Sequence, residues 1–239
     1  MEKIQLVKVS KIFSDSNKGE FTALRSCSLE WNKGECIAVV GESGSGKSTM
    51  GKLITGLIRP TEGEILIDGT STKSWNTKTW REHRKSLQAI FQDSTGTLNP
   101  GMSTYHNAEE ALKNLSNTSK RERKEQILHL MSLMELDEKL LNVPPLYLSG
   151  GEQRRLGLLR SLVLKPNFLV LDEVTAGLDL ISTEAVLRVL ENYRSKYECS
   201  YFVITHDEFV ATRLCNKMIQ IERGEIINRY IKSEDFSSA

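Results

Sequence analysis

Residues 35–57 read ECIAVVGESGSGKSTMGKLITGL, and this stretch decides the fold of the 239-residue chain. It begins with a continuous apolar run, as expected for a strand that is buried on both faces of a parallel sheet. It ends with the apolar spacing of a helix, which we expect over residues 47–57, before Pro60. The glycine-rich segment between them fits the pattern G-x-x-x-x-G-K-[ST], which binds phosphate groups when a strand precedes it and a helix follows it. The sequence therefore predicts an α/β fold with a phosphate loop, Gly41–Ser48.

The phosphate loop predicts a site for a nucleoside triphosphate. Its glycines allow backbone N–H groups to face the phosphates, and the N-terminus of the following helix adds partial positive charge. Lys47 is expected to reach the β- and γ-phosphates, and the Ser48 hydroxyl to ligate Mg²⁺. A dinucleotide site is excluded because Thr49 occupies the position of its third glycine. The predicted residues of the loop site are Gly41, Glu42, Ser43, Gly44, Ser45, Gly46, Lys47, Ser48 and Thr49.

Other segments predict an α/β core around this loop. Short apolar runs at residues 168–171 and 201–204 indicate core strands, with a helix at residues 182–197 between them. Residues 218–231 are typical of a closing hairpin. Residues 93–160 have helical periodicity instead, and the basic cluster at residues 120–124 is interpreted as the solvated face of a helix. We therefore expect a mainly parallel sheet flanked by helices, with a mostly helical insertion.

Composition excludes several classes of protein. The chain has 32 Lys and Arg against 31 Asp and Glu, a net charge of +1, so no general field attracts nucleic acid or an anionic membrane. The longest apolar run, Cys36–Val40, is far shorter than the ~20 residues that span a bilayer, and the N-terminus does not resemble a signal peptide. Four scattered cysteines lack the spacing of metal ligands. We expect a soluble intracellular protein.

Two adjacent carboxylates, Asp172 and Glu173, follow the predicted strand at residues 168–171. Parallel α/β sheets bind ligands beyond the carboxyl ends of their strands, which is where these acids fall. Asp172 is suited to holding Mg²⁺, and Glu173 to polarising a water for attack on the γ-phosphate.

A second loop, the signature loop Leu148–Gln153 (LSGGEQ), precedes a helix that we expect to begin at Glu152. Two glycines after a serine at a helix N-terminus expose backbone N–H groups and a hydroxyl to an anion. One nucleotide has no evident need for two phosphate-binding loops about a hundred residues apart. Two chains arranged head to tail, each offering one loop to the nucleotide of the other, would use both.

With these motifs, nearly the whole chain resembles the ATP-binding subunit of an ABC transporter. In that family the signature loop, here Ser149, Gly150, Gly151 and Glu152, completes the ATP site of a partner subunit. Glu152 stands where the family usually has glutamine, and Val174 stands where it usually has proline. The resemblance implies an α/β P-loop NTPase core of the RecA-like type with a parallel sheet, an N-terminal antiparallel β part and an inserted helical subdomain. It implies one ABC ATPase domain, residues 1–239, with the core at residues 1–92 and 161–239 and the helical subdomain at residues 93–160.

The resemblance also implies roles for four further residues. Phe13 matches an aromatic residue that stacks on adenine, and His206 matches a histidine that contacts the γ-phosphate. Gln92 matches a glutamine that contacts Mg²⁺ and the water and senses the membrane subunit. Asp179 ends a loop that couples the two ATP sites across the dimer. Together these implied roles predict ATP and Mg²⁺ as cofactors.

Residues 91–100, FQDSTGTLNP, and Glu42 resemble the importer branch for oligopeptides, dipeptides and nickel. The short segment after His206 is closer to nickel-type members, which favours metals or metal chelates over peptides as the cargo. Such a subunit would lie on the cytoplasmic face of the cell membrane, contact it only through two transmembrane permease subunits, and work with an extracytoplasmic substrate-binding protein. A second ATPase subunit, which we expect to be a different chain, would complete the pair, and no nucleic acid is expected. A soluble ABC ATPase without a transport role is the alternative from another class, and a P-loop kinase or GTPase switch would not explain the signature loop.

Overall fold

The computed structural model describes residues 1–15, 19–91 and 96–231. A six-stranded sheet has the order β10-β9-β3-β8-β7-β6, in which β3, β6, β7, β8 and β9 run parallel and β10 is antiparallel to β9. Its strands are β3 (Cys36–Val40), β6 (Leu87–Ile90), β7 (Phe168–Asp172), β8 (Ser200–Ile204), β9 (Lys217–Glu222) and β10 (Glu225–Ile231). The prediction of a mainly parallel sheet is therefore confirmed.

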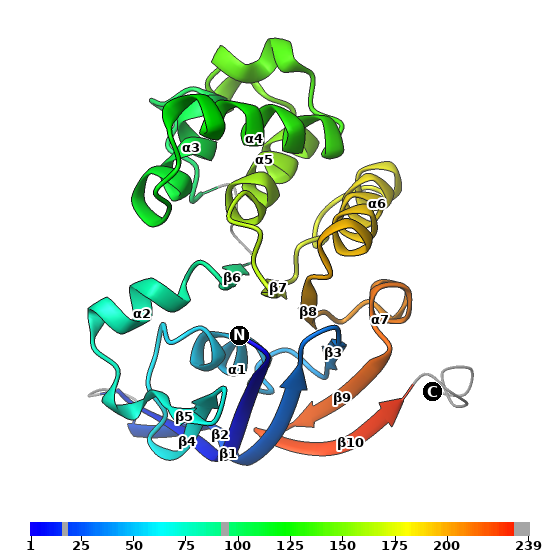
Figure 1. Ribbon diagram of the computed structural model, residues 1–239. Helices are drawn as coiled ribbons and strands as arrows, with labels where there is room; N and C mark the ends of the chain where they lie inside the picture. Colours follow the sequence, from blue (N-terminus) through cyan, green and yellow to red (C-terminus); the bar gives the residue numbers. More distant parts are fainter. Residues whose placement is uncertain (16–18, 92–95, 232–239) are drawn as a thin grey trace.

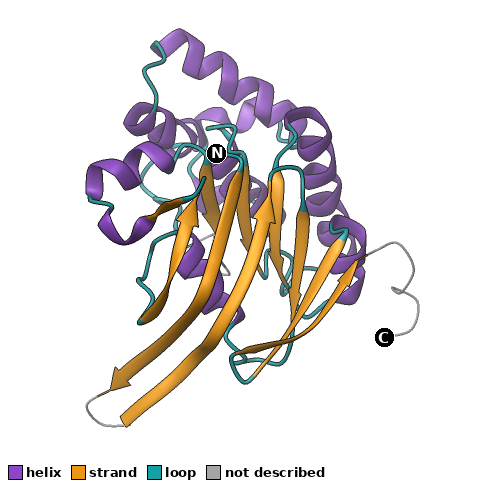
Figure 2. Ribbon diagram, turned by 60° about the horizontal axis from the view of Figure 1, so that its bottom comes forward, coloured by secondary structure: helices purple, strands orange, loops and turns teal. Residues whose placement is uncertain are grey.

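A second, antiparallel sheet has the order β2-β1-β4-β5. Its strands are β1 (Lys3–Asp15), β2 (Gly19–Asn32), β4 (Glu62–Ile67) and β5 (Thr70–Ser71). The long β1 and β2 continue as a two-stranded ribbon beyond the neighbouring strands (Figure 2). This sheet lies on the side of the central sheet opposite α3, α4 and α5 (Figure 1).

The helices are α1 (Lys47–Ile54), α2 (Thr77–His83), α3 (Thr104–Leu115), α4 (Lys120–Leu133), α5 (Gly150–Leu162), α6 (Leu180–Tyr197) and α7 (Glu208–Leu214), with short 3₁₀ turns at Thr72–Ser74, Glu138–Asn142 and Pro145–Tyr147. In the described part of the chain, none of them has the length and apolarity needed to cross a bilayer. Helices α3, α4 and α5 fall in the segment expected to form the helical subdomain, and α5 ends at Leu162, two residues past residue 160, where that subdomain was expected to end. The division of the chain at residues 93 and 160 stays a proposal.

Alternate side chains of the central strands enter two different cores. In β7, Leu169 and Leu171 belong to a core shared with α3, α4, α5 and α6, whereas Phe168 and Val170 belong to a core shared with α1 and the antiparallel sheet. A strand that is covered on both faces needs apolar residues at every position, which explains its continuous apolar sequence. Trp31 of β2 joins the two sheets, because its ring packs edge-on against Phe168 at a centroid distance of 4.6 Å.

Three predicted helix boundaries are corrected by the structure, and the first of them is the start of the helix expected at residues 182–197, which begins at Leu180. The helix predicted over residues 47–57 ends at Ile54, and Gly56 follows with a φ of 68°, a left-handed conformation that glycine adopts at little cost. The helix expected to begin at Glu152 begins at Gly150, because the Ser149 side chain caps it and accepts a hydrogen bond from the Glu152 N–H. The sequence also assigned no element to α2 or β6.

Candidate nucleotide-binding site

The phosphate loop runs from the end of β3 to the start of α1, as its motif predicts. Gly46 has a φ of 109°, and a Cβ at this position would lie 2.3 Å from the Ala23 carbonyl oxygen of β2. A side chain there would collide with backbone, so the position requires glycine. The loop is therefore held directly against the antiparallel sheet, with its N–H groups at a helix N-terminus where anions bind.

Lys47 curls back over this loop. Its Nζ donates hydrogen bonds to the carbonyl oxygens of Gly41 and Glu42, each at 2.7 Å. The residue is only 8% exposed, and this burial lowers the pKa of the ammonium, while the carboxylates of Glu173 and Asp172 act in the opposite direction. A cation poised in this way is suited to phosphate oxygens, which would replace the two carbonyls as partners.

Asp172 ends β7 beside Ser48, the first-turn serine of α1. It is 3% exposed, its carboxylate hydrogen-bonds with Ser48, and its Oδ1 has no hydrogen-bond partner among the residues that the structure describes. Burial raises the pKa of this carboxyl, and the neighbouring Glu173 adds to the shift. A buried carboxylate oxygen without a partner, next to a hydroxyl, fits the oxygen ligands that Mg²⁺ prefers.

Glu173 and His206 meet although they are far apart in sequence. His206 Nδ1 lies 2.9 Å from Glu173 Oε1, because β7 and β8 are neighbours in the sheet and each residue follows its strand closely. Glu173 has a φ of 51°, unusual for a residue with a side chain, and its N–H donates to the Ile204 carbonyl at 2.9 Å. This pair places a hydrogen-bonded carboxylate at the carboxyl end of the sheet, where it can act as a general base toward a water molecule.

The phosphate loop and the Glu173–His206 pair border one hollow of about 620 Å³, called here the nucleotide hollow. Its volume is in the range of small-ligand sites. The predicted site residues that line it are Gly41, Glu42, Ser43, Gly44, Gly46, Lys47, Ser48, Thr49, Glu173 and His206. Ser45 is buried within the loop, and Gln92 lies outside the described residues.

Sequence reasoning missed Phe21, which lines the nucleotide hollow from β2 together with Ala23. Phe13, the aromatic residue that the resemblance pointed to, is not among the described residues that border the hollow. Phe13 and Phe21 lie directly opposite each other in the β1–β2 pairing. The sequence alone carried no signal for Phe21, because its place beside the phosphate loop depends on the packing of β2 against that loop.

The signature loop lies apart from the nucleotide hollow of its own chain. Ser149 and Glu152 form a capping box in which the Glu152 carboxylate accepts from the Ser149 N–H at 2.8 Å and from its hydroxyl at 2.7 Å. These bonds lower the pKa of Glu152. Asp179 caps α6 in a similar way by accepting from the Ser182 N–H at 2.9 Å. Gly151 lies next to Ser182, so the starts of α5 and α6 form one surface.

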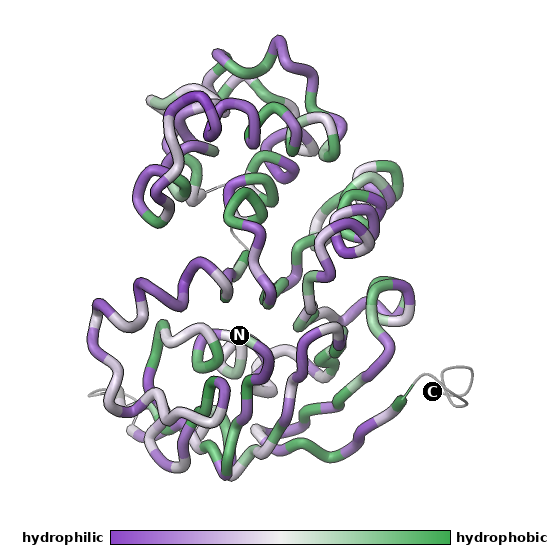
Figure 3. The backbone as a smooth tube through the Cα atoms, viewed as in Figure 1, coloured by the Kyte–Doolittle hydropathy of each residue, from purple (hydrophilic) through white to green (hydrophobic). Residues whose placement is uncertain are grey.

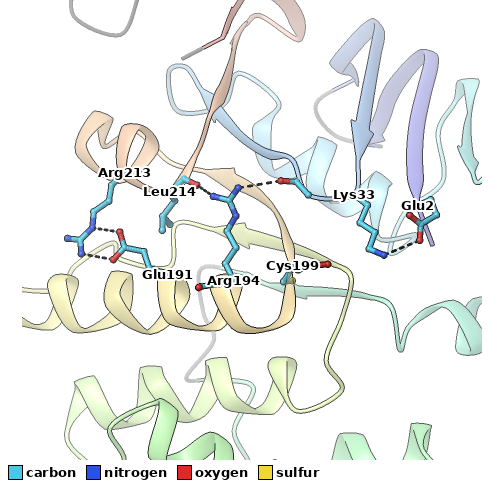
Figure 4. A pocket seen from close by; sticks show the side chains of 10 residues that line it. Glu2, Lys33, Glu191, Arg194, Cys199, Arg213 and Leu214 are labelled. Atoms are coloured by element: carbon cyan, nitrogen blue, oxygen red, sulfur yellow. Dashed lines mark hydrogen bonds and ion pairs between the residues drawn. The ribbon is translucent and has the colours of Figure 1, made fainter. Parts of the chain in front are cut away.

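A larger hollow, of about 760 Å³, lies elsewhere, between α6, α7 and the segment before β3 (Figure 4). Its charged side chains are largely satisfied within the protein. Arg213 pairs with Glu191, Lys33 pairs with Glu2, and Arg194 donates to the carbonyl of Leu214. Size alone therefore does not identify the functional site, because the phosphate loop and the Glu173–His206 pair border the smaller nucleotide hollow.

Comparisons with known proteins agree with this geometry. A family model described as ABC transporter matches residues 24–176. The nickel import ATP-binding protein NikE of Shigella boydii serotype 4 is 32% identical over 204 residues, which cover 85% of this chain and 76% of that protein. The methionine import ATP-binding protein MetN of Helicobacter pylori strain J99 is 34% identical over 235 residues, which cover 98% and 69% of the two chains.

Among solved structures, a dimer of the ATP-binding cassette MJ0796 in a post-hydrolysis state, bound to ADP and Pi, matches with a TM-score of 0.87. It is 29% identical, and the match covers 96% of this chain and 98% of that one. A further match, cbiO1 of Clostridium perfringens, which is described as part of the ABC transporter complex cbiONQ, has a TM-score of 0.86 at 24% identity and supports the fold alone. The expected P-loop NTPase fold is thereby confirmed, and the chain belongs to the ATP-binding subunits of the ABC transporter family.

Proposed function

We propose that this chain hydrolyses ATP to drive an ABC importer, as one of two ATPase subunits that close on two ATP molecules. The observation that carries the proposal is the nucleotide hollow, in which the phosphate loop meets the hydrogen-bonded Glu173–His206 pair. Membership of the ABC transporter family and the likeness to import ATP-binding proteins support the direction of transport.

Within one subunit, the loop N–H groups and Lys47 bind the β- and γ-phosphates. Glu173 orients and polarises the attacking water, and His206 holds the Glu173 carboxylate while contacting the γ-phosphate. Ser48, Asp172 and Gln92 are the residues that would hold Mg²⁺, which when bound offsets the negative charge of the phosphates. Phe13 lies on the ribbon from which the adenine would be contacted.

A second ATPase subunit supplies the hydrogen-bond donors that complete each ATP site. The signature loop does not border the nucleotide hollow of its own chain, yet Ser149, Gly150, Gly151 and Glu152 stand at a helix N-terminus that is suited to an anion. We infer that it closes over the ATP of a partner, which we expect to be a different chain. Asp179, beside the start of α5, then lies where it can couple the two sites.

The cargo is proposed to be a metal of the nickel or cobalt type or a metal chelate such as an opine-like metallophore. NikE is a nickel import protein by name, and the segment at residues 91–100 supports the same branch. Short peptides are the second candidate. In either case two permease subunits and an extracytoplasmic binding protein choose the cargo, and this subunit sits on the cytoplasmic face of the cell membrane with no contact to nucleic acid.

The substitution Glu173→Gln tests the proposed chemistry. The amide keeps the shape of the side chain but cannot act as a base, so we expect ATP affinity within about threefold of wild type and hydrolysis reduced by about 100-fold or more. Light scattering should show an ATP-dependent pair of ATPase subunits that persists in the variant. Glu208→Gln, an exposed carboxylate two residues after His206, is the matched control and should leave turnover unchanged. Wild-type turnover in the Glu173 variant would remove this residue from the mechanism.

A further inference from the structure

Arg213, on α7, binds two carboxylates of α6. Its Nε and Nη2 donate to the two carboxylate oxygens of Glu191, each at 2.8 Å, and Nη2 also donates to Glu184 Oε1 at 3.0 Å. Nη1 pairs with the other oxygen of Glu184. Figure 4 shows the guanidinium reaching from α7 to Glu191. All three nitrogens of the guanidinium therefore hold one helix against the other.

The spacing of the two carboxylates fixes the position of α7 along α6. Glu184 and Glu191 are seven residues apart, which is about two turns, or roughly 10 Å, along the helix axis. A planar guanidinium that pairs with both carboxylates cannot slide along α6 or turn without losing one of the pairs. The Arg213 side chain is only 22% exposed, so salt screens these pairs less than it screens fully exposed ones.

Helix α7 leads directly to His206, because it begins two residues after it. Asp207 caps the helix by accepting from the Phe209 N–H at 2.8 Å. The Asp207 N–H donates to Thr205 Oγ1 at 3.0 Å, which fixes the backbone on both sides of His206. His206 borders the nucleotide hollow and pairs with Glu173. A shift of α7 would therefore move His206 at the site.

Helix α6 leads to the loop that ends in Asp179. Asp179 caps this helix, and Ala176, three residues earlier, borders the nucleotide hollow. Arg154 of α5 donates to the Ala176 carbonyl at 3.1 Å, so the loop is also tied to the helix that follows the signature loop. The start of α6 is therefore linked both to the hollow of its own chain and to the signature loop.

We propose that Arg213 is a positioning residue for ATP hydrolysis, because it fixes α7 against α6 and thereby His206 against the loop that ends in Asp179. The proposal rests on the proposed function, because it needs ATP in the nucleotide hollow and a second ATPase subunit at the signature loop. Loss of Arg213 should loosen two elements of the site relative to each other and leave the phosphate loop unchanged. The fold has other anchors for α7, since three of its side chains are buried in the core. These are Val210, Ala211 and Leu214.

Steady-state ATP hydrolysis by the full-length chain, with the subunits that co-purify with it from native membranes, tests the proposal. Arg213→Gln should lower kcat by about tenfold, because misplacing a group at the site by about 1 Å can cost up to about 100-fold. KM should stay within about twofold of wild type, because the phosphate loop still binds ATP. The Hill coefficient for ATP should fall from about 2 toward about 1, because the two sites lose their coupling.

Matched variants separate positioning from a general loss of stability. Arg188→Gln removes another arginine–carboxylate pair of α6, with Glu135 at 3.6 Å, and should leave kcat unchanged. Arg213→Lys keeps the charge but cannot grip both carboxylates, so its kcat should return only to within about threefold of wild type. The double variant Glu184→Gln/Glu191→Gln should match Arg213→Gln, and adding Arg213→Gln to it should cost nothing more, because the three residues act as one unit.

Side-chain NMR of the histidines in the nucleotide-free chain gives a readout that does not depend on turnover. The imidazole signal of His206 should shift or broaden in Arg213→Gln. The signals of His83 on α2 and His106 on α3 should stay as in wild type. A His206 signal that is the same in wild type and variant would show that Arg213 does not act on His206, and would overturn the proposal.

Two kinetic results would also overturn the proposal: wild-type kcat in Arg213→Gln, or an equal loss of kcat in Arg188→Gln. A lower Tm of Arg213→Gln with unchanged kcat and Hill coefficient would leave the residue a structural role only. Failure of the proposed function is distinct from these results. In that case the wild-type complex would itself hydrolyse no ATP, and the role of Arg213 would fall with it.

Discussion

Replacing Asp172 by asparagine should stabilise the nucleotide-free protein and remove the stabilisation given by Mg-ATP. Asp172 is buried, and its Oδ1 has no hydrogen-bond partner in the described ranges 1–15, 19–91 and 96–231. We therefore expect this carboxylate to serve ligand binding and not the stability of the fold. Asparagine keeps the shape and removes the buried charge, so the two effects should have opposite signs.

The size of the first effect follows from the buried charge, because asparagine keeps a polar atom at the unpartnered position and removes only the charge. An unpartnered buried polar group costs about 1–3 kcal/mol and a charged one costs more, so we take about 1–3 kcal/mol as the gain. In a chain of this length 1 kcal/mol shifts the Tm by about 2–4 °C, so Asp172→Asn should raise the Tm of the nucleotide-free protein by roughly 2–12 °C.

The pH dependence of this gain has a definite sign. The pKa of Asp172 is raised on folding by burial, so the folded state binds a proton over a pH range where the unfolded state has lost it. The stabilising contribution of the protonated carboxyl is present in acid and is lost as the pH rises through the folded pKa. The advantage of asparagine should therefore be full at neutral pH and disappear in acid.

Thermal unfolding in EDTA, in ATP with EDTA and in Mg-ATP measures both effects. At a ligand concentration 100 times Kd, Mg-ATP should stabilise the wild type by about 2.7 kcal/mol, and the variant should gain little. Asp68→Asn is a matched control with the opposite expected sign, because Asp68 Oδ1 accepts from the Glu2 and Lys3 N–H groups and its pKa is lowered. A nucleotide-free Asp172 variant less stable than wild type, or one with an equal Mg-ATP shift, would refute this reasoning.

Two further substitutions test the phosphate loop. Gly46→Ala should abolish nucleotide binding and lower the Tm, because its Cβ would meet the Ala23 backbone. Gly44→Ala should have a markedly smaller effect, because its Cβ would meet nothing within 4 Å. Calorimetric titration measures the binding, and similar results for the two variants would contradict the packing argument. Lys47→Ala should weaken ATP binding by about 100-fold while far-UV circular dichroism stays unchanged, since a charge-assisted contact to phosphate is lost without loss of core packing. Unchanged affinity would remove the phosphate-loop assignment.

The central strands could be predicted because burial on both faces leaves a continuous apolar sequence. The helix α2 and the strand β6 could not. Helix α2 has no buried residue and is mostly hydrophilic in Figure 3; the Asn76 cap and the packing of Trp80 against Trp75 hold it in place. Strand β6, only Leu87–Ile90, is recognised by its pairing with β7 and not by its own pattern.

The phosphate loop could be predicted because its chemistry is contiguous in sequence. The contact between Glu173 and His206 depends on β7 and β8 being neighbours, and strand order is a property of the whole sheet. Phe21 was missed for a related reason. An exposed aromatic residue in a strand gains meaning only when the loop that it faces, 20 residues further along, packs against the same strand.

The central claim, an ATPase that drives import across a membrane, is tested most directly by the partners of the chain. The chain would be tagged at its C-terminus, extracted from native membranes in mild detergent, and its co-purifying proteins identified by mass spectrometry. The account predicts two multispanning proteins, a second ATPase and an extracytoplasmic binding protein, which can then be screened with metals, chelates and peptides. A chain found only in the soluble fraction with ribosomal or DNA-bound partners would contradict the transport claim and leave the ATP site standing.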